Sequence, residues 1–173
     1  MRVAAGAEEE HAAESMDLRT AYHAYAGPMY WYALSLLGRA DEAEDVVHDV
    51  FAALLRRGKG SVIAQPRAYL LKAVRRQSVR ARRRWGREAS LAEEEMVSWV
   101  EVIEDRDRAL DVDRAVKSLP GEQREVVTLK VLGELTLREI GQVLGISENT
   151  VTSRYRLALV KLRVAPRKDG PDG

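Results

Sequence analysis

The chain has 173 residues, of which 46% are hydrophobic and 32% charged, and its formal net charge is +1. This length allows one ordinary domain or two small ones with separate cores and excludes a large enzyme fold. It contains no cysteine, which excludes disulfides, thiolate zinc sites and cysteine nucleophiles. No apolar stretch resembles a signal peptide or approaches the ~20 residues that cross a bilayer, so we expect a cytoplasmic protein without membrane contact.

The near-zero net charge hides two oppositely charged blocks. Between residues 67 and 87 there are basic residues and no acid: Arg67, Lys72, Arg75, Arg76, Arg80, Arg82, Arg83, Arg84 and Arg87. Between residues 88 and 113 acids dominate: Glu88, Glu93, Glu94, Glu95, Glu101, Glu104, Asp105, Asp107, Asp111 and Asp113. A basic strip of this density favours nucleic-acid binding over a merely solubilising role, because phosphate contacts release counterions whatever the base sequence.

Apolar residues recur at three and four positions rather than at two, which predicts an all-α protein. We expect residues 1–15 to be disordered and a first helix over residues 16–37, with Pro28 either kinking it or opening a second segment. Gly38 is expected to end this helix.

A second helix is predicted over residues 41–56. Asp41 and Glu44 have the spacing of a capping box that starts it. Its apolar stripe predicts a core face, made by Val46, Val47, Val50, Phe51, Leu54 and Leu55. Another face displays Asp45, His48, Asp49 and Ala52, and we interpret it as a docking surface for a basic protein, with a solvated face as the alternative.

The third predicted helix begins at Pro66, after a loop over residues 56–66. Tyr69, Leu70, Ala73 and Val74 can bury one face, whereas from Arg75 onward arginine dominates and the second half is not expected to be core. Tyr69 and Trp85 flank the basic strip and could stack on bases, although Tyr69 also suits a partly buried position.

Residues 88–113 read as an acidic linker with at most a marginal helical segment, followed by a second domain over residues 114–165 and a disordered tail over residues 166–173. Pro120 is placed in the first turn of a helix that runs to about Val131, and Gly133 breaks it. Thr136 and Glu139 have the spacing of another capping box.

Gly141 and Gly145 lie four apart in a stretch that is otherwise helical. In a helix-turn-helix unit the first helix needs a small residue at the crossing and the turn needs a left-handed residue, which explains both glycines. Ser147 is the expected N-cap of the second helix. The core between the helices is predicted to consist of Ile140, Leu144, Ile146 and Val151.

The second helix of this unit is predicted over residues 148–163, about 24 Å long at 1.5 Å per residue, which suits a major groove. Val151, Tyr155, Ala158 and Leu162 share its inner face. Its outward face carries Asn149, Thr152, Ser153 and Arg156, which can read base edges, while phosphate contacts are expected from Arg154, Arg156, Lys161 and Arg163. The alternative is an ordinary helical hairpin with a solvated polar face.

No catalytic, metal or cofactor site is predicted. His11, His23 and His48 are dispersed, and Glu44 with His48 lacks a third ligand at a telling spacing. An enzyme acting on nucleic acid and a small-molecule substrate are therefore not expected. A free-standing helix-turn-helix regulator that binds duplex operators stays open as an alternative, although it leaves the acidic face of the second helix unexplained.

Three segments in this order resemble the extracytoplasmic-function group of the bacterial sigma-70 family: AEDVVHDVF (43–51), PRAYLLKAVRRQSVRARRR (66–84) and LPGEQREVVTLKVLGELTLREIGQVLGISENTVTSRYRLALVKLR (119–163). The resemblance implies a region two domain over residues 16–87 and a region four helix-turn-helix domain over residues 114–165. It implies that the protein binds core RNA polymerase and directs promoter recognition, melting and initiation. An anti-sigma protein is a further candidate partner, because many members are held by one.

The resemblance also implies three sets of site residues. Core polymerase is expected to contact Asp41, Glu42, Asp45, His48 and Asp49. The minus-ten element is expected to meet Lys59, Tyr69, Lys72, Arg75, Arg76, Arg80, Arg83 and Arg84. The minus-thirty-five element is expected to meet Ser147, Glu148, Asn149, Thr150, Thr152, Ser153, Arg154 and Arg156.

The chain departs from residues common in the family at five positions. His48 replaces Gln, Tyr69 replaces Trp, Arg76 replaces Asn, Arg80 replaces Asp and Thr152 replaces Lys. Because of these five differences, the resemblance does not imply which promoter sequence this chain prefers.

Overall fold

The computed structural model describes residues 18–57, 63–84 and 106–164. Within these ranges the chain forms seven α-helices and no strand, which confirms the all-α prediction. In chain order they are α1 (Leu18–Leu37), α2 (Ala40–Arg57), α3 (Pro66–Arg84), α4 (Arg106–Lys117), α5 (Gly121–Val131), α6 (Leu137–Leu144) and α7 (Glu148–Val164). The predictions for the two termini, for Lys59 and for Trp85 lie outside the described residues.

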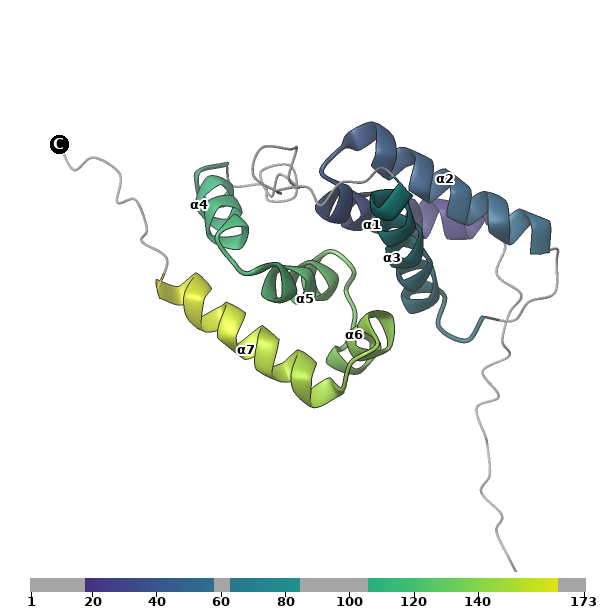
Figure 1. Cartoon of the computed structure of the whole chain (residues 1–173). Coiled ribbons are helices and arrows are strands. Elements are labelled where there is room, and N and C mark those ends of the chain that lie inside the picture. Colours follow the sequence, from purple (N-terminus) through teal and green to yellow (C-terminus); the bar gives the residue numbers. More distant parts are fainter. Residues whose placement is uncertain (1–17, 58–62, 85–105, 165–173) are drawn as a thin grey trace, which may run out of the picture.

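Helices α1, α2 and α3 pack on one another and form the first half of the molecule (Figure 1). α1 is one helix that runs through Pro28, so the prediction of a separate second segment is wrong. The residues after Pro28 carry most of its core face, with Met29, Tyr32 and Ala33 at most 1% exposed. Gly38 adopts φ +73° and its N–H donates to Leu34 O at 2.8 Å, which ends the helix as expected.

α2 buries four of the six residues of the predicted stripe, and Leu54 is half-buried against the core. Val46, Val47, Val50 and Phe51 are buried, but Leu55 is 64% exposed. Because four residues at 100° each overshoot a full turn by 40°, the stripe drifts around the helix and Leu55 falls beyond its edge. The expectation that Leu55 is core was therefore wrong.

α3 places a basic face outward and a small-residue face inward. Leu70, Leu71 and Val74 are buried in its first half, and Ser78 and Ala81 are buried in its second half. The prediction that the second half cannot be core was therefore wrong, because its two smallest side chains fit beneath the arginines.

Helices α4 to α7 form the second half, with a core that includes Val116, Leu119, Val126, Leu129, Leu135, Ile140 and Val151. α4 begins at Arg106, so the last eight residues of the expected linker (106–113) are helical. α5 begins one residue after Pro120, which stands at its N-cap rather than inside its first turn.

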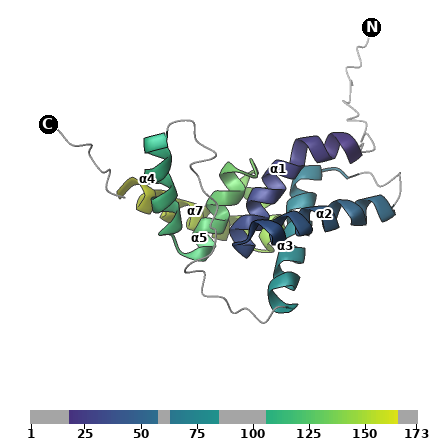
Figure 2. The ribbon, with the colours of Figure 1, turned by 90° about the horizontal axis from the view of Figure 1, so that it is seen from above.

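The two halves pack directly against each other. α3 contacts α6, and α1 contacts α5. Figure 1 shows α5 and α6 lying between the first half and α7, and Figure 2 shows α5 next to α1, with α4 on its far side. The sequence predicted two helical domains but not this packing of one domain on the other.

Candidate nucleic-acid interface

The corner between α6 and α7 has the backbone geometry that its two glycines predict. A Cβ on Gly141 would lie 2.9 Å from Ile146 O, so the turn leaves no room for any side chain there. Gly145 is the C-cap of α6 with φ +71°, and its N–H donates to Gly141 O at 2.8 Å. Both glycine predictions are confirmed, because each position meets a steric requirement that only glycine satisfies without strain.

Side-chain caps fix both ends of this corner. The Thr136 hydroxyl accepts from Glu139 N, and the Glu139 carboxylate accepts from Thr136 N, which confirms the capping box. The Thr136 N–H and, to a smaller extent, the Thr136 hydroxyl donate to Glu139 Oε2, and these two hydrogen bonds lower the pKa of the Glu139 carboxyl. At the start of α7, Ser147 Oγ accepts from Thr150 N at 3.1 Å, which confirms Ser147 as the N-cap.

The first turns of α7 present a short polar surface to solvent. Val151 and Ala158 are fully buried on its inner side, whereas Glu148, Asn149, Ser153 and Arg156 are exposed. Thr150 and Thr152 are half-buried, and their hydroxyls are engaged locally with Ser147 Oγ and Glu148 O. Among these residues, the exposed side chains are thus distinct from Thr150, which bonds to the N-cap, and from Thr152, which bonds back to the α7 backbone.

Arg154 differs from this surface. Its Nη2 lies 2.9 Å from Glu122 Oε2 of α5, and its side chain is 24% exposed. Arg154 was expected to meet phosphates, but in this conformation its guanidinium is paired with Glu122, which lies two helices earlier in the same half.

The outer face of α3 forms a basic ridge, defined as Lys72, Arg76, Arg80, Arg83 and Arg84, all of which are exposed. Their spacing of mostly three or four residues puts them on one side of the helix. Arg75 was predicted among them, but it turns away and its Nε donates to Glu125 Oε1 at 3.0 Å. The ridge is therefore continuous without Arg75.

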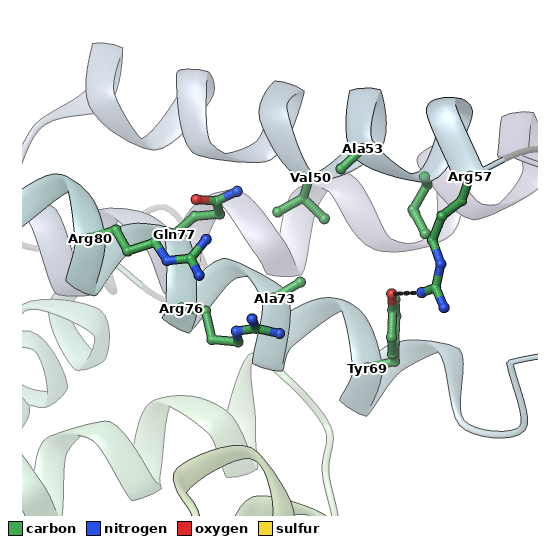
Figure 3. A pocket seen from close by; sticks show the side chains of 9 residues that line it. Val50, Ala53, Arg57, Tyr69, Ala73, Arg76, Gln77 and Arg80 are labelled. Carbon is green, nitrogen blue, oxygen red and sulfur yellow. Dashed lines mark hydrogen bonds between the residues drawn. The ribbon is translucent and has the colours of Figure 1, made fainter.

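A cavity of about 160 Å³ opens between α2 and α3 beside this ridge (Figure 3). Tyr69, Arg76 and Arg80, three of the residues expected to meet the minus-ten element, line it from α3. Sequence analysis missed Arg57 of α2 and Gln77 of α3, although Gln77 follows Tyr69 and Ala73 at the helical period. Arg57 Nη1 donates to the Tyr69 hydroxyl at 2.6 Å, which fixes the position of the ring.

The outer face of α2 is acidic. Asp45, His48 and Asp49 are exposed, and so is Glu44, which the predicted set omitted. Asp41 is exposed and its carboxylate accepts two hydrogen bonds from Arg39, the main cause of its lowered pKa.

Two expectations for the start of α2 do not hold. The helix begins at Ala40, so Asp41 is a helical residue and not the predicted N-cap. Glu42 is only 6% exposed and lies 3.2 Å from Arg39 Nε, so it does not belong to the displayed acidic face. The turn at Gly38 brings Arg39 over both carboxylates, and a pattern of helical spacing does not reveal this.

Comparison with known proteins gives the same division of the chain. Residues 21–88 match the family model for Sigma-70 region 2, and residues 109–162 match that for Sigma-70 region 4. The ECF RNA polymerase sigma factor SigL from three strains of Mycobacterium tuberculosis is 31% identical over 167 residues, which cover 92% of this chain and 94% of SigL. The chain is an extracytoplasmic-function sigma factor of the sigma-70 family.

A solved structure supports the fold. The sigma factor RpoE, in complex with the anti-sigma factor NepR from Bartonella quintana, aligns with a TM-score of 0.60 at 20% identity and covers 88% of this chain and 96% of RpoE. As an alternative sigma factor, the protein binds core RNA polymerase and promoter DNA and directs transcription initiation. Sigma factors regulate transcription and are not themselves enzymes.

The described part of this sigma factor contains neither a membrane-spanning helix nor a cluster of metal-ligating side chains. Among the helices of the described ranges, none is long and apolar enough to cross a bilayer. Over the same residues, no three acidic or histidine side chains gather as they would around a metal ion.

Proposed function

We propose that this sigma factor divides promoter recognition between two surfaces, the first turns of α7 for the minus-thirty-five element and the basic ridge of α3 for the minus-ten element. The observation that carries this proposal is the continuous ridge, because its five exposed cations stand in a segment that contains no acid. Counterion release makes such a surface bind nucleic acid independently of base sequence.

α7 suits the major groove of the minus-thirty-five element. Its 17 residues give a length of about 26 Å at 1.5 Å per residue. Residues near the N-terminus of a recognition helix contact base edges. Asn149, Ser153 and Arg156 are the exposed side chains placed to do so, and Glu148 can accept from cytosine. Ser147 and Thr150 contribute mainly by forming the N-cap of α7, which orients these exposed side chains.

At the minus-ten element, the ridge binds the backbone while the neighbouring cavity receives an unstacked base. Tyr69 supplies an aromatic ring at the cavity wall, and bases stack on such rings whatever their identity. Arg76 and Arg80 belong to the ridge and also line the cavity, so each can bind a phosphate beside the captured base. Taking a base out of the duplex is the first step of promoter melting.

The acidic face of α2 docks on core RNA polymerase. Asp45, His48 and Asp49 point to solvent, and a row of carboxylates repels DNA but attracts a basic protein surface. At 100° per residue this face lies opposite the side of α2 that lines the cavity beside the ridge, so both surfaces can be occupied at once. The cytoplasm, where the polymerase works, is the expected location.

Run-off transcription with purified core polymerase and a library of genomic fragments tests this function. Discrete start sites that need the sigma factor are expected, whereas initiation equal to that of core alone would contradict the proposal. Tight, polymerase-independent binding to duplex DNA would instead support a free-standing regulator.

A charge-reversal pair tests the docking face in the same assay. Asp45→Lys with Asp49→Lys should weaken binding to core polymerase without changing the helix content. The matched control is Asp111→Lys with Glu122→Lys, which reverses two acids in the second half and should leave core binding of the first half intact.

A further inference from the structure

The cavity between α2 and α3 combines an apolar lining with polar groups that are mostly donors. Its apolar side chains are Val50, Ala53, Leu54 and Ala73. Its polar groups are three guanidiniums, the Gln77 amide and the Tyr69 hydroxyl, and the described residues that line it include no acid. Guanidiniums donate hydrogen bonds and accept none. The cavity therefore binds an occupant mainly through the acceptor atoms of that occupant.

The three arginines of the cavity are not equivalent. Arg57 Nη1 donates to the Tyr69 hydroxyl at 2.6 Å, so this guanidinium is already engaged. Figure 3 shows the Arg80 guanidinium beside the Gln77 amide, on the side of α3 that faces α2, whereas Arg76 ends farther from α2. None of the described residues accepts a hydrogen bond from Arg80. Arg80 and Gln77, three residues apart and hence neighbours on the helix surface, are called the recognition pair below.

The edges of the four bases differ in whether two acceptors lie side by side. Guanine presents O6 and N7 next to each other, and a guanidinium that donates to both makes the commonest base-specific contact in proteins. Adenine presents an amino donor beside N7, and this amino group would face the donors of the guanidinium. Thymine presents O4 beside a methyl group. The recognition pair therefore favours guanine over adenine and thymine.

Cytosine also has two adjacent acceptors, O2 and N3, so stacking decides between cytosine and guanine. Tyr69 supplies the aromatic ring of the cavity, and a two-ring base covers more of that ring than a one-ring base does. Stacking strength is a source of base preference on such aromatic side chains. Guanine also carries N1–H beside O6, so the Gln77 oxygen can accept from it while Arg80 donates to O6 and N7.

We propose that the base captured in this cavity is guanine, and that Arg80 and Gln77 determine this specificity. The proposal rests on the proposed function, because it assigns an identity to the base that the cavity receives. Tyr69 stacks on the base and Arg76 binds a neighbouring phosphate. Since a guanidinium carries several N–H donors, Arg80 holds the base edge and still contributes to the basic ridge.

Selection from a random pool of short single-stranded DNA molecules tests the identity of the base. Holoenzyme assembled from the full sigma factor and purified core polymerase binds the pool, and the bound molecules are sequenced, with core polymerase alone as the background. Guanine should be enriched at one position by roughly 5- to 150-fold, the range of one bidentate contact. Enrichment of any other base at the position that depends on Arg80 overturns the proposal.

Substitutions of Arg80 change the preference in a direction that its chemistry predicts. In Arg80→Gln the amide offers one donor and one acceptor, which match N6 and N7 of adenine, so the enriched base should change from guanine to adenine. Arg80→Ala should leave the four bases about equally represented at that position. Because Arg80 is exposed, both variants should keep their helix content. A guanine preference that survives in Arg80→Ala overturns the role of Arg80.

A ridge variant is the matched control for these substitutions. Arg83 is exposed on the same helix but does not line the cavity. Arg83→Ala should weaken binding to every sequence and keep the guanine preference, because a phosphate contact carries no base identity. Gln77→Leu removes the acceptor for N1–H and should lower the guanine enrichment several-fold. An unchanged enrichment in Gln77→Leu overturns the part assigned to Gln77.

A modified base tests the contact at a single atom. 7-Deazaguanine has C–H in place of N7 and keeps O6 and N1–H. At the enriched position it should weaken binding of the unchanged chain by roughly tenfold, the loss of half of a bidentate contact. It should weaken Arg80→Ala no further, because the contact is already absent. An equal loss in both proteins overturns the contact between Arg80 and N7.

The same selection separates this proposal from the proposed function. If the holoenzyme selects a defined sequence in which no position depends on Arg80, the guanine assignment fails and the minus-ten function stands. If the holoenzyme selects nothing beyond the background of core polymerase, the minus-ten function of the ridge and cavity fails, and the guanine assignment fails with it.

Discussion

The two surfaces proposed to bind DNA are built by different physical means. The α6–α7 corner depends on backbone requirements at single positions, namely a close approach at Gly141, a left-handed residue at Gly145 and caps at Thr136 and Ser147. The ridge of α3 depends on none of these, since its cations are exposed side chains on a regular helix. Substitutions should therefore affect folding at the corner and binding at the ridge.

Substitutions in the ridge should change DNA binding more than substitutions in the corner. Replacing Lys72, Arg76 and Arg80 with alanine removes three phosphate contacts, so the slope of log affinity against log salt for single-stranded DNA should fall by roughly 2. Stability should change little, because all three side chains are exposed. Salt titration of binding to a labelled oligonucleotide measures this slope. Replacing Arg19, Arg56 and Arg114, which are exposed elsewhere, removes the same charge and should leave most of the slope in place.

The corner should show the largest change in stability. Gly141→Val places a Cβ 2.9 Å from the backbone oxygen of Ile146. Because a backbone atom cannot move aside as the end of a flexible side chain can, we expect the free energy of unfolding to fall by about 3 kcal/mol. Gly121→Ala is the matched control in the same half, because nothing lies within 4 Å of its Cβ. Urea unfolding followed by helix content measures both variants. Equal stability of the two would mean that the corner tolerates a side chain and that the contrast with the ridge is false.

Arg156 combines both features, because the α6–α7 corner orients its side chain and the charge of its guanidinium binds DNA. Arg156→Ala should cost about 2 kcal/mol at promoters that depend on the upstream element if the guanidinium contacts a base. Transcription from such promoters should fall, whereas promoters that rely on the minus-ten element should be spared. Arg114→Ala, on α4, is the control. An equal loss at both promoter classes would assign Arg156 to a sequence-independent phosphate contact.

Sequence analysis succeeded where a local rule decides the outcome. Gly145, Ser147 and the Thr136–Glu139 box follow from helix-end chemistry within a few residues of the chain, and the structure has each in the expected role. The exposed ridge of α3 also followed, because helical spacing alone places its cations on one face.

Sequence analysis failed where the partner of a charged side chain lies on another element of the fold. Arg75 and Glu125 are 50 residues apart, and nothing in the basic strip distinguishes Arg75 from Arg76, although one is held by the second half and the other faces solvent. Arg154 was misplaced for the same reason, since its partner Glu122 lies on α5. Glu42 was expected to contact core polymerase from the resemblance, and its burial against Arg39 was missed because Arg39 lies in a turn that helical spacing does not describe. A charge pattern gives the density of cations but not which of them the fold neutralises.

Of these predictions, the one on the capping box of α6 has the smallest expected effect on stability. It also tests most directly whether the α6–α7 corner depends on its helix-end hydrogen bonds. The pKa of Glu139 is lowered in the folded protein, so the stability it contributes is complete above its usual value of 4.5 and is lost as the pH falls below 4.5 through the folded-state pKa. Because the carboxylate is largely exposed and screened by solvent, we expect the loss to be at most about 1 kcal/mol. Glu139→Gln keeps an acceptor oxygen without a titrating charge. Urea unfolding from pH 6 to pH 3 should therefore show the two proteins converging only in the acidic range. Parallel pH profiles would mean that the carboxylate charge adds nothing to the cap, and the corner would then rest on its glycines and on Ser147.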